Sequence, residues 1–297
     1  MDYFFLFFAV VCFTAQFAFT KLFEEAMGQS KAASMVMLAV TNAIGFGLFF
    51  CLGGFRIAFT PVAFLLALAM GLIMIPYYLL GIRVLSLGSL AVYSMFMMLG
   101  GMLVPFFYGL LFLEEAVSWG KGLGTVLLAL CMILQATLPE APEKSRRAKG
   151  KKGLFFALCI LIFFINGFTG VIAKAHQISA APIPETSFTA LSCGITGILS
   201  GVLLAAGKGE KKPILRAAFK RKPLGIMVGL GVSAYTGSFL HLMAAETVPA
   251  SVQFPLVSGG VIVLSALASA WIFKEKVTRQ EWLCVSGAFL ATCLFAF

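Results

Sequence analysis

Long apolar stretches alternate with short polar connections along almost the whole chain. Ten of these stretches have roughly the 20 residues that a helix needs to cross about 30 Å of hydrocarbon. Their apolar residues are continuous rather than alternating, which favours helices over the strands of a β-barrel. The predicted spans are 3–21, 32–53, 61–81, 87–113, 118–138, 153–174, 186–206, 223–245, 250–273 and 279–297. The pattern therefore predicts an all-α polytopic membrane protein with ten transmembrane helices.

Composition supports this class and excludes a soluble domain. The 297 residues are 61% hydrophobic and 11% charged, with a mean hydropathy of +1.01, whereas soluble domains carry about 25% charged residues. The first span lacks the basic start and small-residue cleavage site of a signal peptide, so we expect it to be retained. The seven cysteines are dispersed through apolar segments without a Cys-x-x-Cys pair, which predicts buried thiols and no metal site.

The basic residues predict an orientation in the membrane. The connections after spans 1, 3, 5, 7 and 9 hold 19 of the 22 lysines and arginines. The net charge of +10 therefore indicates membrane topology and not a nucleic-acid partner, since cytoplasmic loops are enriched in these residues. We expect loops 139–152 and 207–223 to be cytoplasmic, both termini to lie outside, and the protein to be a multi-pass protein of the cell membrane.

Two stretches far apart in the chain are similar to each other. "LGGMLVPFFYGLLFLEEAVS" begins at Leu99 and "SGGVIVLSALASAWIFKEKVT" at Ser258; each combines a Gly-Gly pair, an apolar run, a glutamate and Val-Ser/Thr. Their common order predicts a duplication, with repeats at 1–138 and 153–297 joined by the basic loop 139–152. Because five spans is an odd number, the second repeat would be inverted relative to the first. Inverted repeats are typical of secondary transporters, whose substrate site lies between them near the midplane.

This arrangement resembles the drug/metabolite transporter superfamily, and more narrowly its EamA-type ten-helix members. The resemblance rests on two five-span repeats, each with an apolar fourth span that ends in a glutamate, "FLEEAVS" and "IFKEKVT", and it covers essentially the whole chain. The family motif has glycine before this glutamate, where the present chain has Glu114 and Lys274. The resemblance implies transport of small metabolites. It also implies cytoplasmic termini, in conflict with the charge count.

Polar side chains well inside the spans are candidates for a substrate cavity. An uncompensated amide in hydrocarbon is costly, so each should face a cavity or form a hydrogen bond to another helix, and both interpretations stay open. The candidates are Gln16, Asn42, Tyr78, Tyr93, Asn166, Thr169, Tyr235, His241 and Gln253. The Gly-x-x-x-Gly patterns, among them Gly120/Gly124, Gly197/Gly201 and Gly225/Gly229, are interpreted as packing sites.

Charged residues at the span ends are the second candidate set. Lys21 and Lys174 end spans 1 and 6, where they either extend to the headgroups or form a paired site for an anionic substrate group. Glu115 and Glu275 either terminate the helix, with Ser118 or Thr278 capping the next one, or act as a gate or latch between the repeats.

These observations favour a secondary transporter that works by alternating access and exports or exchanges amino-acid-like or other polar organic solutes. No catalytic constellation, no metal-binding motif and no Gly-x-x-x-x-Gly-Lys-Ser/Thr motif is present in the sequence, so we expect neither an enzyme nor a cofactor. The alternatives are a membrane-embedded enzyme or a non-transporting membrane scaffold. The expected partners are a small-molecule substrate and the lipid bilayer; proton or counter-substrate coupling and a homodimer stay open.

Overall fold

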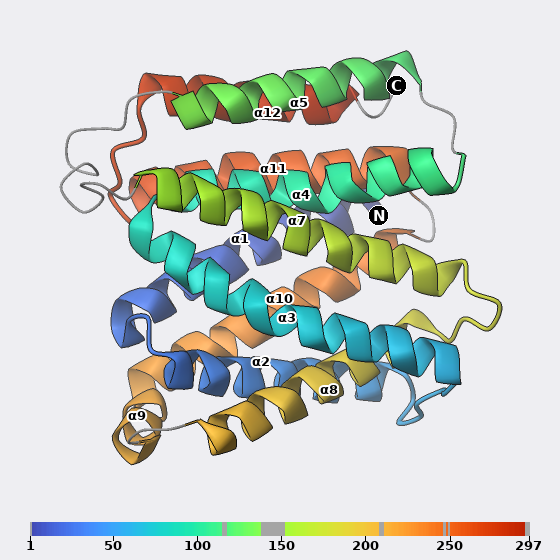
Figure 1. Cartoon of the computed structure of the whole chain (residues 1–297), viewed down its shortest axis with the longest axis vertical. Helices are drawn as coiled ribbons and strands as arrows, with labels where there is room; N and C mark the ends of the chain where they lie inside the picture. Colours follow the sequence, from blue (N-terminus) through green and yellow to red (C-terminus); the bar gives the residue numbers. More distant parts are fainter. Residues whose placement is uncertain are drawn as a thin grey trace. The chain divides into compact units, whose positions relative to one another are not determined.

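The computed structural model describes residues 2–114, 118–137, 152–207, 211–245, 248 and 250–294. Within these ranges all regular secondary structure is helical, as predicted (Figure 1). The helices are α1 (Asp2–Met27), α2 (Lys31–Leu52), α3 (Pro61–Leu87), α4 (Leu90–Phe112), α5 (Trp119–Thr137), α7 (Lys152–Gln177), α8 (Glu185–Ala206), α9 (Lys211–Ala218), α10 (Arg221–Ala245), α11 (Ala250–Trp271) and α12 (Arg279–Leu294). Each predicted span coincides with one helix, and α9 is additional.

Seven of the helices in the described ranges are long and apolar enough to cross a membrane, namely α1, α2, α3, α4, α7, α8 and α10. In α5 and α11 the apolar stretches are shorter, Trp119–Leu134 and Leu256–Trp271. Large apolar side chains on several helices are well exposed, for example Leu111 at 70% and Ile198 at 69%, as expected of side chains that face lipid. The helices fit a membrane protein, while the full number of ten spans stays a prediction.

Two helices continue by more than a full turn beyond the ends that hydropathy predicted. α1 reaches Met27 rather than 21, and α3 reaches Leu87 rather than 81. The added turns contain charged residues, which sequence patterns place outside hydrocarbon although their backbone continues the helix. α1 is followed by Gly28 in the left-handed region, with φ of 65°, which is a common helix stop because glycine lacks a Cβ. Hydropathy therefore marks where the apolar stretch ends and not where the helix ends.

The short helix α9 lies in the stretch that the sequence predicted to be a polar loop. Pro213 occupies its first turn, where proline is tolerated. Lys212 and Arg216 are exposed whereas Ala218 is fully buried, and α9 packs on α2. The apolar side of this short basic helix therefore packs against α2, and its basic side chains stay exposed.

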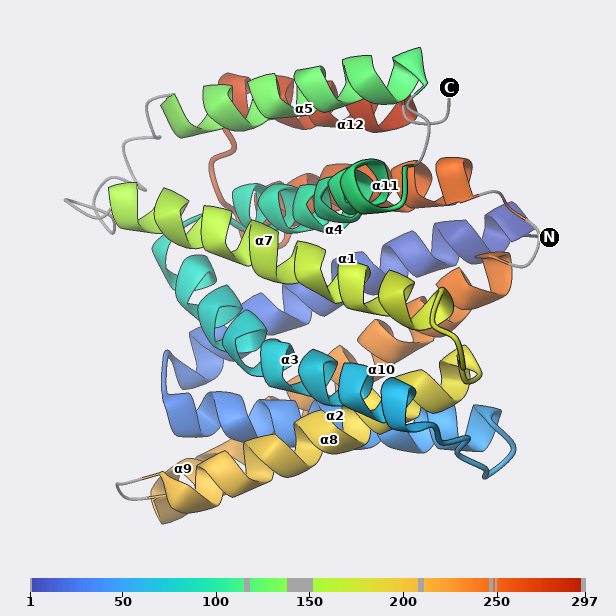
Figure 2. The same ribbon diagram turned by 45° about the vertical axis from the view of Figure 1, so that its right-hand side comes forward.

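The chain forms two compact units, each with segments from both halves of the sequence. Unit 1 comprises Met1–Ala18, Leu87–Phe168 and Thr236–Phe297. In it α5 packs against α12, and α4 packs against α11. Both views show the two helices of each pair side by side and running in opposite directions (Figures 1 and 2). Every one of these pairs joins a helix of the first half to its predicted counterpart in the second half.

Unit 2 comprises Phe19–Ser86 and Thr169–Tyr235. Its central contact is the antiparallel packing of α2 against α8, again a helix and its predicted counterpart (Figure 2). A small apolar cluster joins α3 to the start of α8, with Ala63 and Ala67 packed together with Ile183 and Phe188. This cluster lies around the polar network that is described below.

Close helix packing occurs mainly at glycines outside the Gly-x-x-x-Gly patterns. A methyl group on Gly100 of α4 would lie 2.1 Å from the carbonyl oxygen of Phe163 in α7, so the two backbones are in direct contact. By contrast, a methyl group on Gly201 or Gly225 would meet nothing within 4 Å. The packing interpretation therefore fails for these two glycines but holds for the other glycine of each pattern, since a methyl group would lie 2.6 Å from Phe19 at Gly229 and 3.8 Å from Asn42 at Gly197.

Candidate functional site

Three of the predicted cavity residues come together in unit 2. The hydroxyl of Tyr235, in α10, donates a hydrogen bond to Oδ1 of Asn42, in α2, over 2.9 Å. The Nδ2 group of Asn42 donates to the carbonyl of Leu38 over 2.9 Å, and the side chain is only 3% exposed. Tyr78 of α3 is buried and lies close enough to Tyr235 for the two phenol groups to interact electrostatically. Residues from both halves of the sequence thus form one polar group inside an apolar unit.

The position of the Tyr235 ring depends on a glycine. A methyl group on Gly45 of α2 would lie 2.4 Å from Cζ of Tyr235, so the ring occupies the space that a side chain would fill. Phe49, one turn further along α2, meets the ring edge-on with centroids 6.2 Å apart. The thiol of Cys193 in α8 is buried and lies near the Tyr235 hydroxyl. The spacing of the cysteines gives no signal for this neighbourhood.

The two candidate lysines also belong to unit 2. Lys21 lies within α1 and not at its end, and its side chain is 5% exposed. Lys174 is half-buried in the last turn of α7. The proposed extension to the headgroups does not fit Lys21, because protein covers its side chain.

The other predicted cavity residues are distributed over the two units. In unit 1 Asn166 donates through Nδ2 to the carbonyl of Met97 over 2.6 Å, and buried Gln253 donates through Nε2 to the carbonyl of His241 over 2.5 Å. Tyr93 is buried and meets the ring of Phe17 edge-on. The remaining two, Gln16 of unit 1 and Thr169 of unit 2, are half-buried.

Glu275 lies at a junction between two helices of unit 1. Its Oε2 atom accepts a hydrogen bond from the backbone N–H of Leu90, the first residue of α4, over 3.2 Å. The hydroxyl of Ser269, in α11, also donates to this carboxylate. A carboxylate at a helix N-terminus satisfies an unpaired N–H and interacts favourably with the helix dipole. Glu115, its predicted counterpart, lies outside the described residues.

The residues before the two motif glutamates share an unusual backbone conformation. Glu114 has φ of 52° and Lys274 has φ of 50°, both in the left-handed region. Glycine adopts this region without the steric cost that a Cβ imposes. Glycine would adopt this conformation without strain, whereas this chain adopts it with two charged residues.

The helices after these turns begin as the sequence predicted. Ser118 accepts from the backbone N–H of Lys121 over 3.4 Å at the start of α5. At the start of α12 Thr278 accepts from the N–H of Glu281 over 3.2 Å, while the Glu281 carboxylate accepts from the N–H of Thr278 over 2.7 Å. This reciprocal pair is a capping box, so the predicted capping roles of Ser118 and Thr278 are confirmed.

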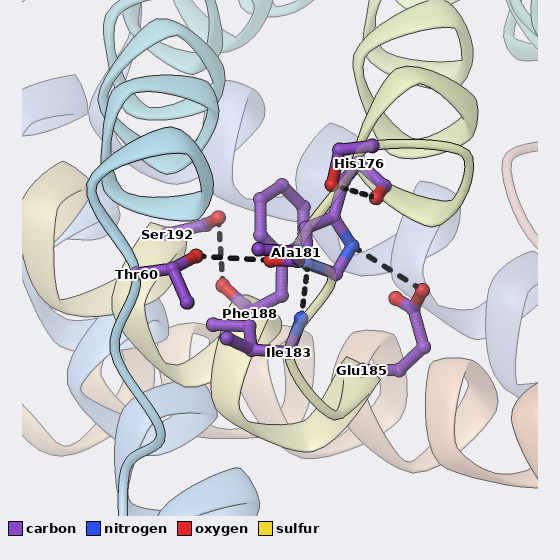
Figure 3. A network of polar contacts seen from close by, with 8 residues as sticks. Thr60, His176, Ala181, Ile183, Glu185, Phe188 and Ser192 are labelled. Carbon is purple, nitrogen blue, oxygen red and sulfur yellow. Dashed lines mark hydrogen bonds and ion pairs between the residues drawn. The ribbon is translucent and has the colours of Figure 1, made fainter.

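A polar network that no sequence pattern indicates surrounds His176 in unit 2 (Figure 3). The ring of His176 is fully buried and stacks on Phe188 with centroids 4.0 Å apart and planes inclined by 14°. Its Nε2 atom accepts from the backbone N–H of Ile183 over 3.2 Å, and its Nδ1 atom lies 3.5 Å from Oε1 of Glu185. The sequence placed His176 just beyond the end of span 6, and only the extension of α7 to Gln177 brings it into the folded unit.

Within the described residues no group of three or more histidine, cysteine, aspartate or glutamate side chains is arranged to hold a metal ion. The polar groups of both units are amides, hydroxyls, phenols and a few charged side chains. Such groups bind and orient polar solutes through hydrogen bonds.

Comparisons with known proteins define a fold but no function. No family model matches the chain. A Haemophilus influenzae protein that is described only as uncharacterized is 22% identical over 182 residues, which make up 61% of this chain and 57% of that protein. A crystal structure whose description names no function shares the fold with a TM-score of 0.53 and 14% identity, and the likeness covers 97% of this chain and 95% of that chain. The class that these findings support is an all-helical protein with helices suited to a membrane.

Proposed function

We propose that this chain is a secondary transporter of small polar organic solutes, of the drug/metabolite transporter type, and that it works by alternating access in the cell membrane. Its ten helices form two inverted five-helix repeats, with the basic loops 139–152 and 207–223 in the cytoplasm. Export or exchange of amino-acid-like solutes is the activity that the resemblance favours.

The observation that carries the proposal is the packing of helices on their counterparts. α2 packs on α8, α4 on α11 and α5 on α12, and the members of each pair run in opposite directions (Figure 1). A two-fold axis in the membrane plane relates inverted repeats in this way. The shared left-handed conformation of Glu114 and Lys274, at equivalent points of the two halves, supports the same relation.

The polar group of unit 2 supports a solute as the ligand. Asn42 comes from the first repeat and Tyr235 from the second, and they meet over 2.9 Å. An amide and a phenol offer both donors and acceptors but no fixed charge, while the covered Lys21 adds a cation in the same unit. A polar solute such as an amino acid has donors and acceptors that match the amide and the phenol.

Counterflow in proteoliposomes tests this proposal. The purified chain is reconstituted with a high internal concentration of one solute class, and uptake of the same labelled solute is followed; amino acids, sugars, nucleosides and organic anions are compared. We expect accumulation for amino-acid-like solutes, and a higher melting temperature in detergent with the same class, since a ligand of the folded state stabilises it. Neither flux nor stabilisation with any class, in a folded sample, would overturn the proposal in favour of a scaffold.

A further inference from the structure

In the connection between α7 and α8, residues 178–184, a histidine side chain binds the backbone at one point. Two prolines, Pro182 and Pro184, flank Ile183, and proline has no backbone N–H. Ile183 therefore supplies the only backbone donor of the segment 182–184, and this N–H is bonded to Nε2 of His176. Both residues are buried, with His176 at 0% and Ile183 at 7% exposure.

The same connection is tied to the one between α2 and α3. The Thr60 hydroxyl donates to the carbonyl of Ala181 over 3.0 Å, as Figure 3 shows. A second hydrogen bond joins the α2–α3 connection to α8. The backbone N–H of Ala58 donates to Oγ of Ser187, in the first turn of α8, over 3.1 Å. His176 thus fixes a segment that joins two connections from opposite halves of the sequence, within unit 2.

The hydrogen bond to Ile183 determines the protonation state of the ring. A neutral imidazole has one donor and one acceptor nitrogen. Because Nε2 accepts from Ile183, its lone pair is free of a proton, and the proton of the neutral ring is on Nδ1, which faces Glu185 at 3.5 Å. A second proton on Nε2 would oppose two donors, and the bond to Ile183 would be lost.

Protonation would exchange one contact for another. The imidazolium would keep Glu185, now as an ion pair, and would lose Ile183. The charged residues of the surrounding segments are few: Glu185 on α8, Lys174 on α7 itself and Arg56 on the α2–α3 connection, while the facing first turns of α3 carry none. Glu185 is thus the carboxylate that stabilises the protonated ring.

We propose that His176 is a proton-operated clasp: the neutral ring holds the α7–α8 connection against the α2–α3 connection, and the protonated ring keeps its contact with Glu185 but releases the connection at Ile183. Both connections lie on the side that the charge count predicts to face away from the cytoplasm. The clasp is independent of which solute is transported.

Hydrogen exchange of the full-length protein in detergent tests the clasp without a transport assay. Exchange of the peptide that contains Ile183 is measured from about pH 8 to about pH 5 and is corrected for the intrinsic pH dependence of exchange. Loss of one buried hydrogen bond predicts about fivefold faster corrected exchange at the acidic end. Equal protection at both ends of the range would overturn the proposal.

Three variants assign the effect. His176→Gln offers an amide oxygen to Ile183 but does not titrate, so its exchange should no longer depend on pH. His241→Gln replaces the other of the two histidines and should keep the transition. Glu185→Gln removes the charge that pairs with the imidazolium, so the acidic increase in exchange at Ile183 should be smaller than in the wild type. If His176→Gln does not fold, the wild-type and Glu185→Gln profiles decide, and an equal increase in both contradicts the clasp.

Discussion

The carboxylate of Glu275, just after α11, accepts a hydrogen bond from the backbone N–H of Leu90 at the start of α4 over 3.2 Å. The end of one helix thereby caps the beginning of its counterpart, whose own N-cap residue Ser89 accepts from Val92 over 3.4 Å. Glu275 therefore has a structural role in unit 1 as a capping carboxylate. This role differs from both sequence-based interpretations, a helix stop and a gate or latch.

Glu275→Ala should lower the stability of the protein by about 0.5–2 kcal/mol, because the N–H of Leu90 loses its acceptor. Glu275→Gln should cost less, since its amide oxygen still accepts. The measurement is the apparent melting temperature in detergent. Gln280→Ala, at an exposed position of α12, is the control and should leave it unchanged; an equal loss in all three variants would contradict the capping role.

Glycine in place of Lys274 or Glu114 should raise stability. Both residues have φ near 50°, where a side chain costs about 1–2 kcal/mol that glycine avoids. Lys274→Gly should therefore melt at a higher temperature, whereas Lys274→Ala, which removes the same side chain but keeps a Cβ, should not. A gain in the alanine variant would assign the effect to charge and not to the backbone.

Gly100→Ala should destabilise unit 1 strongly. Its methyl group would lie 2.1 Å from the carbonyl oxygen of Phe163, and overpacking of this kind costs about 1–3 kcal/mol. Gly122→Ala is the matched control, because a methyl group there meets nothing within 4 Å and alanine favours a helix. The two variants are compared by size-exclusion profile and melting temperature. Equal melting temperatures would show that α4 and α7 are not in contact.

Asn42 and Tyr235 should be energetically coupled. Tyr235→Phe leaves Oδ1 of Asn42 without its phenol donor, and a double-mutant cycle with Asn42→Leu should give a coupling of about 0.6 kcal/mol, up to about 1.7. The free energy of unfolding in mixed micelles measures it. Tyr93→Phe, in the other unit, combined with Asn42→Leu should be additive, and a coupling of zero in the first pair would contradict the contact.

Labelling in intact cells should assign the two sides of the membrane. The charge count predicts that Lys212→Cys faces the cytoplasm and Arg56→Cys the outside; both side chains are exposed. In a background without the seven native cysteines, an impermeant thiol reagent should therefore modify the second variant and not the first until the cells are opened. The reverse pattern would favour the topology that the family resemblance implies.

The apolar pattern alone was enough to predict every helix of the described residues except α9, because a backbone in hydrocarbon must bond to itself. The paired stretches around Glu115 and Glu275 predict a duplication, which stays a prediction. Capping by Ser118 and Thr278 was predictable too, since a cap bonds only to its own helix.

Other features depend on contacts between distant segments, which no local pattern encodes. The contact of Asn42 with Tyr235 and that of Glu275 with Leu90 each bridge the two halves of the sequence. His176 was overlooked because its hydropathy assigns it to a loop, whereas α7 carries it into a buried stack on Phe188. The sequence by itself determined which segments are helices in an apolar environment; only the tertiary structure decided which polar side chains meet, since hydrogen bonds between helices depend on packing.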